Sequence, residues 1–590
     1  MLQRSAAQQQ ALTRYLSDLQ NPASPRYHKW LSPAQYGAQF GTSDSDLATV
    51  ESWLEAEGFR IERVPQARNI IQFSGTLGQL QSAFRTSVHT FVVNGQSYLA
   101  NVSEPQIPTA LAPVIAGVGP LNDFHPKPTL VSGPKATYDS LNHRFEPQPS
   151  LTFPIGNANT PFLFAVPADI ATIYDTPNAS LNANFTGATS YNGNGINIGI
   201  VGVSDLTIAD VQNYRTGFLG ETSTSVNLPT QVIDGNDPGL VSGAATEALL
   251  DNEVAGGLAP GAKIYYYTAA NTDLSDGLFN SILRAIDDNA VGILSISFSG
   301  CEADQGSSGN ALILETAEQA AAQGISMVVS AGDGGAAGCD NFDTATAAQH
   351  GLAVNGIAST PYTIAVGGTD FDALSQSFTS YVNSGGQYAA GTPPYYRSAL
   401  KYIPENPWNN STTVNGSLSQ NVAATSSQGA TNIVAGGGGV SSIYSKPSFQ
   451  TSLTPTDGQR DVPDVSLLSG SGLYQALWLL CSDNLSDGSS TSYTDCQNTN
   501  GTFQSGTYFS GVGGTSASAP AFAGMLALVS QAQGGSASGP GKLRSVSVGR
   551  IEPVHLPRSH HGEQLSPLCF CLAKLRIEPL PHRIQRGGGL

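Results

Sequence analysis

Charge is scarce in this chain. Only 12% of its 590 residues are charged, and 26 lysines and arginines stand against 44 aspartates and glutamates, a formal net charge of −18. Such a surface does not suit nucleic acid or an anionic membrane. The sequence also lacks any apolar run of about 18 residues, so we expect no membrane span. Because acid neutralises carboxylates and the cations are few, the composition predicts tolerance of low pH.

Histidine is scarce as well. Of nine histidines, only His350 falls between residues 150 and 550. It lies in an Ala-Ala-Gln-His-Gly-Leu turn with no acidic residue close in sequence, and we interpret it as structural. A Ser-His-Asp triad is therefore not expected in the central part of the chain.

A serine with the setting of a nucleophile lies near residue 520. Ser516 occupies a glycine-rich turn, residues 513–520, that opens a small-residue helical run at 521–533. Glycines permit a tight turn and a close substrate, and the free N–H groups of a helix start stabilise negative charge. The alternative is a plain surface turn. With no histidine at hand, the base for Ser516 is expected to be a carboxylate.

Two carboxylates are suitably spaced for that task. Glu247 and Asp251 lie four residues apart in the helix-like stretch 246–255, so they share one helical face. Two carboxylates held together in a cleft resist double ionisation and share a proton, which makes an acid/base pair suited to acidic solution. The alternative is a solvated acidic face.

A third carboxylate follows a buried strand. Asp333 stands at the end of the run Val-Val-Ser-Ala-Gly-Asp that begins at Val328, and it is flanked by glycines. The carboxyl ends of such strands are where open α/β sheets place their chemistry. A protonated Asp333 would donate its O–H to a tetrahedral oxyanion. The alternative is an aspartate that caps a turn.

The order of elements predicts an α/β core. Apolar, β-branched runs and helical patterns alternate, which is typical of a parallel sheet flanked by helices. The expected strands are 196–203, 264–267, 293–298, 325–329 and 364–366, and the expected helices are 247–255, 278–287 and 311–322. The polar stretch 375–432 is predicted to form surface loops and short antiparallel pieces.

Together these motifs resemble the sedolisin and kumamolisin family of serine-carboxyl peptidases, subtilisin-like proteins in which glutamate replaces histidine. The resemblance also covers residues 253–264, 295–298, 363–369 and 437–441. It implies a subtilisin-like parallel sheet flanked by helices. The roles that it implies are the base for Glu247, support of that base for Asp251, the oxyanion donor for Asp333 and the nucleophile for Ser516.

The same family accounts for the expected domain organisation. The run Tyr-His-Lys-Trp-Leu-Ser-Pro, with helices expected at 8–19 and 44–57 and strands at 69–74 and 88–93, resembles the family's activation propeptide. That propeptide is an α+β domain that assists folding and covers the active site; the alternative is an unrelated N-terminal binding domain. We expect the propeptide at 1–121, an exposed Pro-rich linker at 122–160, the peptidase domain at 161–534 and an aberrant tail at 535–590.

The resemblance implies a serine-carboxyl endopeptidase that acts in acid and is made as a zymogen, with self-cleavage inside the linker. Its expected partners are protein or peptide substrates and its own propeptide, and we expect a monomer. Two alternatives stay open: a tripeptidyl-peptidase of the same family, and an inactive secreted pseudoprotease that only binds.

Cysteines point to an exported protein. We expect disulfides between Cys301 and Cys339 and between Cys481 and Cys496, with four free thiols as the alternative. No signal peptide is recognised at Met1, and we expect that the start was assigned late or the signal lost. The expected location is extracellular.

The last fifty or so residues differ from the rest. From Lys542 onward the chain carries 8 of its 26 lysines and arginines and four of its nine histidines. Family members continue at this place into a calcium-binding loop, which is not recognisable here, so Ca²⁺ is expected from the resemblance alone. A frameshift near residues 535–539 would explain the change.

Overall fold

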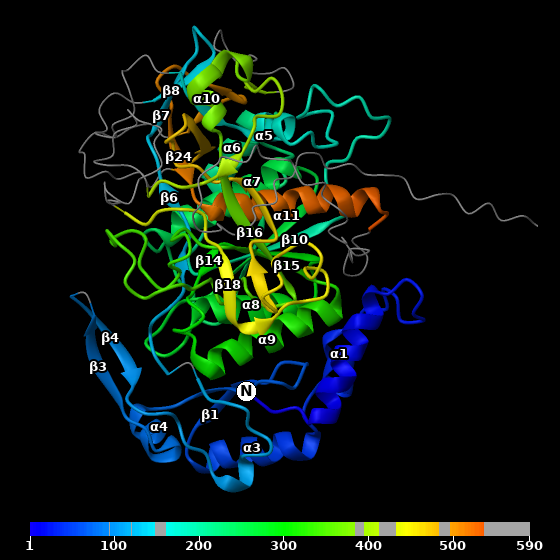
Figure 1. Ribbon diagram of the computed structural model, residues 1–590, viewed down its shortest axis with the longest axis vertical. Helices are drawn as coiled ribbons and strands as arrows, with labels where there is room; N and C mark the ends of the chain where they lie inside the picture. Colours follow the sequence, from blue (N-terminus) through cyan, green and yellow to red (C-terminus); the bar gives the residue numbers. More distant parts are fainter. Residues whose placement is uncertain are drawn as a thin grey trace, which may run out of the picture.

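A parallel sheet forms the centre of the larger part of the molecule (Figure 1). The computed structural model of the chain describes residues 1–93, 95–119, 121–147, 161–383, 395–411, 432–482 and 496–535. The strands of this sheet are β10 (Asn197–Gly202), β11 (Thr230–Ile233), β12 (Lys263–Thr268), β13 (Ile293–Ile296), β15 (Ser326–Ser330), β16 (Thr363–Asp370), β17 (Asn406–Pro407) and β20 (Val465–Leu468). Their order is β11-β12-β10-β13-β15-β16, with β20 parallel and β17 antiparallel to β16.

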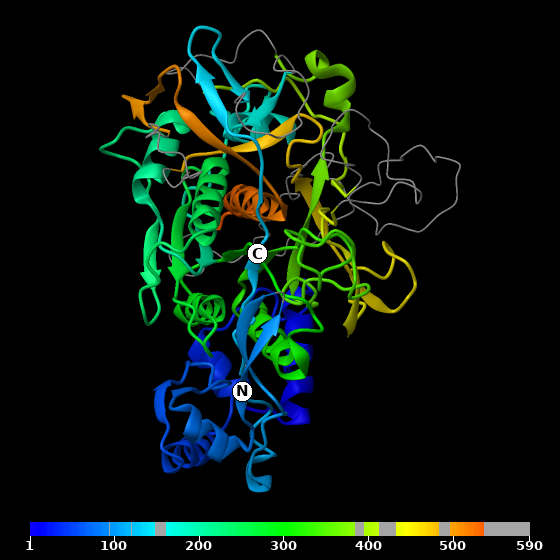
Figure 2. The ribbon, with the colours of Figure 1, turned by 90° about the vertical axis from the view of Figure 1, so that its left-hand side faces the viewer.

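Helices cover both faces of the sheet (Figures 1 and 2). They are α5 (Pro167–Ile173), α6 (Ile208–Leu219), α7 (Ala244–Leu258), α8 (Gly277–Asp288), α9 (Gly306–Gln323), α10 (Asp372–Ser377) and α11 (Thr515–Ala532). One face packs on α7 and α11, and the other packs on α8 and α9. Successive residues of β15 alternate between the two cores, since Val328 faces the first and Val329 the second.

The prediction of a parallel sheet flanked by helices is confirmed. Each expected strand and helix of the core is present within a few residues of its expected bounds, with one change. The run 293–298 is split at Ser297, so that β13 stays in the central sheet and β14 (Phe298–Ser299) pairs with β5 (Lys127–Pro128) instead. The chain therefore leaves the central sheet at Ser297, and the next two residues pair with a strand from the expected linker.

A second sheet includes part of the expected linker. Its strands are β6 (Val131–Ser132), β7 (Ala136–Asp139), β8 (Arg144–Pro147), β9 (Leu163–Ala165), β21 (Ala476–Leu480) and β24 (Tyr508–Gly513). Tyr138 and Phe145 are buried in one aromatic core with Phe164, Phe503 and Phe509. The described part of the linker, 122–147, is thus partly buried rather than exposed throughout, because its aromatic side chains complete this core.

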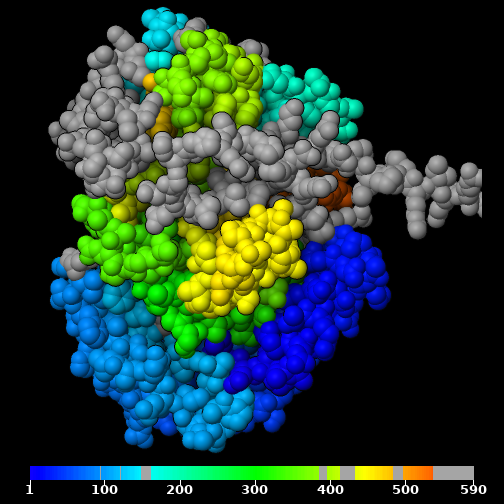
Figure 3. All heavy atoms as spheres, in the orientation of Figure 1, coloured from blue at the N-terminus to red at the C-terminus, as the bar shows by residue number. Residues whose placement is uncertain are grey.

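The N-terminal residues form a separate α+β unit. Its elements are α1 (Ala6–Gln20), α2 (Pro33–Phe40), α3 (Asp44–Ala56), β1 (Arg60–Arg63), β2 (Gln72–Ser74), α4 (Leu77–Phe84), β3 (Val88–Val93), β4 (Gln96–Asn101) and the short 3₁₀ helix η1 (Thr109–Leu111). Capping boxes define helix starts, as at Ser5 and Gln8 for α1. The unit covers one end of the larger domain (Figure 3).

Helices α1 and α2 attach this unit to α9. Arg4 forms ion pairs with Glu315 (2.7 Å) and Glu318 (2.9 Å) on α9, and all three side chains are at least nine-tenths buried. Helix α9 lies on the face of the central sheet opposite to α7 and α11. The helices of the N-terminal unit that contact α9 therefore lie on the far side of the sheet from α7 and α11.

Smaller pieces complete the larger domain. They are η2 (Phe378–Ser380), the pair β18 (Gly439–Ser445) and β19 (Gln459–Val462), and the hairpin β22 (Asn498–Thr499) and β23 (Thr502–Phe503). The prediction of surface loops over 375–432 is wrong for part of that stretch, because Tyr396, Ile403 and Trp408 are buried in the core. Residues 384–394 and 412–431 lie outside the described residues.

Buried carboxyl groups are spread through the larger domain. Burial raises the pKa of Asp169 to about 6, and those of Asp370 and Glu405 to about 7. Asp169 accepts three backbone N–H groups, from Val166, Ser398 and Ala399, which hold down a pKa that burial raises. These groups are neutral in acid and become charged inside the protein as the pH rises.

We expect the protein to be most stable in acid. A carboxyl whose pKa is raised by folding makes its full contribution to the free energy of unfolding at pH values below its pKa in the unfolded chain. That contribution is lost as the pH rises through its pKa in the folded protein. Ionising Asp370, whose pKa moves from 3.8 to about 7, costs the folded state about 4 kcal/mol. The melting temperature should therefore fall from about pH 4 to about pH 8, and Asp370→Asn should reduce that fall. A melting temperature that rises over this interval would contradict the prediction.

Candidate active site

The four predicted site residues converge at one edge of the central sheet, where its parallel strands end. Glu247 and Asp251 lie on α7, Asp333 follows β15, and Ser516 lies in the first turn of α11. All four are at most 1% exposed. Glu247 feels the charges of Asp251 and Asp333 and the hydroxyl of Ser516, so α7, β15 and α11 bring these groups into one buried cluster.

Ser516 lies inside a helix, which differs from the turn that the sequence predicts. Helix α11 begins at Thr515, with Gly514 as N-cap at φ +100°. A Cβ at Gly514 would collide with the carbonyl oxygen of Thr129 and lie 2.6 Å from Asp333 Oδ2. Glycine is therefore required both by the backbone and by the space beside the serine.

The carboxyl pair on α7 is poorly solvated. Burial raises the pKa of Glu247 well above its usual value, and the neighbouring charges of Asp251 and Asp333 raise it further. The Ser516 hydroxyl partly offsets this rise, although neither Glu247 oxygen makes a hydrogen bond of normal geometry. Burial also raises the pKa of Asp251, against the effect of a 2.6 Å hydrogen bond from the Ser297 hydroxyl. In acid the pair retains a proton.

Asp333 is held with one oxygen free. Its Oδ1 accepts the backbone N–H and the hydroxyl of Thr515, both at 2.8 Å, whereas Oδ2 has no partner. Burial raises the pKa of Asp333 to about 8, against the effect of the two Thr515 hydrogen bonds. Below that pH the carboxyl is neutral and has an O–H to donate.

A strand from the N-terminal side lies across these groups. Residues 127–128 pair antiparallel with β14, and residues 131–132 pair antiparallel with β24, just before Ser516. Figure 2 shows this segment rising from the N-terminal unit past the end of α11. Between the two paired stretches lies Thr129, which is fully buried.

The peptide group of Thr129 faces the serine. Its N–H donates to the carbonyl of Ser297 at 3.2 Å, and its own carbonyl oxygen accepts the N–H of Ser516 at 3.1 Å. The Thr129 hydroxyl lies 2.8 Å from Ser516 Oγ and donates to Ser330 Oγ at 2.8 Å. A peptide carbonyl is thus bound beside Ser516, at the start of α11 where helix N–H groups favour negative charge.

Three residues of the site were not predicted as functional from the sequence. Thr129 lies in the linker, where nothing in the sequence identifies its partners. Ser297 belongs to the stretch 295–298 that carries part of the family resemblance, but its contact with Asp251 joins positions 46 apart. Thr515 adjoins Ser516, and this adjacency is the one signal that would have found it.

His350 lies apart from this cluster, as the prediction of a structural role requires. Its Nδ1 is 2.7 Å from Asp340 Oδ1, and 65% of its side chain is exposed. This acidic partner is ten residues away in sequence, and the turn between residues 340 and 350 folds back to bring it close.

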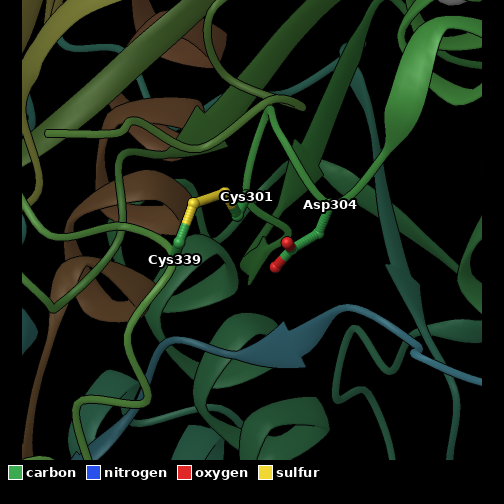
Figure 4. Close-up of side chains that lie close together, drawn as sticks. All are labelled: Cys301, Asp304 and Cys339. Atoms are coloured by element: carbon green, nitrogen blue, oxygen red, sulfur yellow. A yellow bond between two sulfur atoms is a disulfide. The ribbon is translucent and has the colours of Figure 1, made fainter. Parts of the chain in front are cut away.

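Both predicted disulfides are present, Cys301–Cys339 and Cys481–Cys496, with Cα separations of 4.9 and 5.2 Å. Cys301, Cys339 and Asp304 also form the one gathering of three metal-ligating groups among the described residues (Figure 4). Because the two sulfurs are bonded to each other, a single carboxylate is left, which does not fit Ca²⁺ with its six to eight oxygen ligands. The expected calcium-binding end and the proposed frameshift fall on residues 535–590, which lie outside the described residues apart from Gly535.

Comparison with known families identifies the class. Residues 239–548 match the model of the subtilase family, and residues 2–124 match that of the pro-kumamolisin activation domain. The chain therefore belongs to the subtilase family of serine-type peptidases, which are hydrolases, and carries an N-terminal activation domain. No helix in the described part of the chain has the length and apolar character needed to cross a membrane.

Among known proteins, the chain is similar to sedolisins and kumamolisins. The chain is 26% identical to sedolisin from Pseudomonas sp. (strain 101) over 76% of its length, and 28% identical to xanthomonalisin from Xanthomonas sp. (strain T-22) over 77%. It is 29% identical to kumamolisin from Bacillus sp. (strain MN-32) over 59%. These alignments span 66%, 51% and 57% of the respective relatives. A solved structure of Pseudomonas sedolisin complexed with two molecules of pseudo-iodotyrostatin matches at 24% identity with a TM-score of 0.44, covering 65% of this chain and 84% of that one.

Proposed function

We propose that the chain is the zymogen of a serine-carboxyl endopeptidase that hydrolyses peptide bonds in acid. One observation carries this proposal: the carbonyl of Thr129 accepts the Ser516 N–H at 3.1 Å, beside the free oxygen of Asp333. That is the arrangement in which a peptide carbonyl is polarised for attack.

The mechanism assigns one task to each of the four site residues. Glu247 accepts the Ser516 proton as Ser516 Oγ attacks the carbonyl carbon, and Asp251 orients and tunes Glu247. The oxyanion accepts hydrogen bonds from the Ser516 N–H and from protonated Asp333. Glu247 then protonates the leaving nitrogen, and water attacks the acyl-enzyme with Glu247 again as base.

Acid activity follows from the same groups. Asp333 must be protonated to donate, which holds below its pKa of about 8. Glu247 and Asp251 are coupled through their charges and both pKa values are raised, so that one shared proton persists in acid. We expect the rate to rise as the pair loses its first proton and to fall as Asp333 loses its own.

Residues 127–132 lie across the site as a bound peptide would, and we call them the substrate-like strand. This strand favours an endopeptidase over a tripeptidyl-peptidase. If Thr129 precedes the bond to be cut, Lys127 is the third residue before that bond, and the described chain continues without a break through Pro126 on that side. On the other side the strand leaves along β24. A site that holds a chain extending both ways does not require a free N-terminus, and the assembled buried cluster likewise disfavours an inactive binding protein.

We further propose that the zymogen cuts its own Thr129–Leu130 bond. Propeptide and peptidase would then be joined only by non-covalent contacts, such as those of Arg4 with Glu315 and Glu318. The two disulfides and the propeptide support our expectation of a secreted enzyme that acts on proteins or peptides outside the cell. That it is a monomer stays an expectation.

The test is conversion of the purified chain in acid. At about pH 4 the precursor should shorten to a form that begins at Leu130, and the product should hydrolyse an internally quenched peptide with blocked ends. Mass spectrometry and N-terminal sequencing identify the cut bond, and fluorescence follows hydrolysis.

Ser516→Ala provides the control, because it removes the nucleophile and leaves a buried small residue at the start of α11. It should neither convert nor hydrolyse peptide. Conversion by the wild-type chain at another bond would contradict the assignment of Thr129 alone, whereas hydrolysis that persists in Ser516→Ala would refute the serine mechanism. Cleavage confined to peptides with free N-termini would favour the tripeptidyl alternative.

A further inference from the structure

Ser297 lies at the junction between the central sheet and the substrate-like strand. It separates β13 from β14 and is fully buried. Its hydroxyl donates to Asp251 Oδ1 at 2.6 Å. Its carbonyl oxygen accepts the N–H of Thr129 at 3.2 Å and the hydroxyl of Ser516 at 3.2 Å. One residue therefore contacts the carboxyl pair, the nucleophile and the bound peptide.

A further contact joins Ser297 to α11. Pro520 has no N–H, so the carbonyl of Ser516 loses the partner that it would have four residues on in a regular helix. The Ser297 hydroxyl lies 3.4 Å from that carbonyl oxygen. Since a hydroxyl has a single hydrogen, Ser297 donates to Asp251 when Asp251 is charged and is free to turn to Ser516 when Asp251 is protonated.

Among the residues that the structure describes, no cation acts on Asp251 to compete with this hydrogen bond. The titratable groups around it are Glu247 on its own helix and Tyr266 on β12, with Asp333 acting on Glu247. The Tyr266 hydroxyl donates to the carbonyl of Ser204 at 2.7 Å, so it is engaged elsewhere. Asp251 Oδ2 has no hydrogen-bond partner. Among the described residues, the Asp251 carboxyl therefore accepts one hydrogen bond, from the Ser297 hydroxyl to Oδ1.

We propose that Ser297 is a positioning residue that fixes which oxygen of Asp251 shares the proton with Glu247, and thereby sets the acid limit of the enzyme. By occupying Oδ1, Ser297 leaves Oδ2 for the shared proton. It also stabilises the charged form of Asp251, because a donor to a carboxylate favours ionisation. This inference rests on the proposed function, in which Glu247 acts only after the pair has lost one proton.

Replacing Ser297 by alanine should move the acid limb of the pH–rate profile upward. Without the Ser297 donor, Asp251 stays protonated to higher pH, so the pair of Glu247 and Asp251 loses its first proton at a higher pH. A hydrogen bond to a charged group corresponds to a shift of about one to two pH units. KM should change little, because the contact with the bound peptide is made by the Ser297 backbone. Ser297→Thr, which retains the hydroxyl, should restore the limb.

Ser295→Ala is the matched control. Ser295 is two residues earlier on β13, is equally buried, and its hydroxyl has no hydrogen-bond partner. In this variant, the acid limb of the pH–rate profile should lie at the same pH as in the wild type. A Ser297→Ala profile lowered in height at unchanged pH dependence would overturn the proposal, because a merely structural defect reduces the amount of active enzyme without moving its ionisation.

A second measurement does not require turnover. In the Ser516→Ala background, infrared difference spectra report the pH at which buried carboxyl groups lose their protons, and Ser297→Ala should raise one of these values. If wild-type enzyme hydrolyses nothing at any pH, the proposed function fails, and this titration still decides whether Ser297 controls Asp251. An unchanged titration refutes the inference even if hydrolysis is normal.

Discussion

Glu247→Gln is expected to lower kcat/KM by about 10²- to 10⁴-fold, the contribution typical of a general acid or base. The amide has nearly the same size and neutral charge as a protonated glutamic acid, so the buried cluster should remain folded. It has no basicity, however, and no histidine in the described part of the chain forms a hydrogen bond with Ser516 that could replace it. Stopped assays on a blocked peptide at the pH optimum measure the loss.

The chain provides a closely matched control for this change. Glu253 lies on the same helix, is equally buried, and also has a strongly raised pKa. It accepts the backbone N–H of Cys481 at 2.9 Å, a bond that glutamine can accept as well. Glu253→Gln should therefore leave kcat/KM near the wild-type value. Equal losses in both variants would mean that burying an amide in α7, and not loss of the base, causes the defect.

Asp333 is expected to show a large difference between two substitutions. Asp333→Ala removes the donor and should lower kcat by about 10²- to 10³-fold, as when an oxyanion donor is lost. Asp333→Asn should retain most of the rate, because its carbonyl can accept both Thr515 bonds and its NH₂ group takes the place of Oδ2–H. The amide does not titrate, so the fall in rate near pH 8 that Asp333 causes should disappear or move.

Profiles of kcat against pH for the three proteins distinguish the possible roles. If Asp333→Asn were as damaging as Asp333→Ala, donation from this position would not be its function. A fall near pH 8 that remained in Asp333→Asn would assign that ionisation to Glu247 and Asp251. Melting temperatures of both variants separate effects on catalysis from loss of folded protein.

Local pattern was enough to predict the core of the fold. The apolar run 325–329 became β15 (Ser326–Ser330), and the acidic stretch around Glu247 became α7. Both elements are runs of mostly small or apolar residues that are buried along almost their whole length, so composition and length identify them without an exposed face. The position of Asp333 followed as well, since an aspartate after a buried strand in such a sheet lies at the edge where the other site residues meet.

The strand at Thr129 could not be predicted in the same way. Its partners, Ser297, Ser330, Val512 and Ser516, come from distant parts of the chain. A Pro-rich sequence gives no sign of such pairing, and composition alone indicates an exposed linker. The start of α11 was misjudged for a related reason, because Gly514, Thr515 and Pro520 favour a turn in isolation. The first turn of α11, which follows Gly514, makes contacts with Asp333 and Ser297 that the local sequence does not reveal.

The second sheet has a consequence for the order of events after self-cleavage. Strands β6, β7 and β8 belong to the six-stranded sheet through their pairing with β24 and with each other. If the zymogen cuts its Thr129–Leu130 bond as proposed, the segment after that bond stays covalently joined to the peptidase domain and is also held in its sheet. We therefore expect that β6 must detach before a new substrate can lie along β24. Release of the first product would then be a local unfolding step of the enzyme itself.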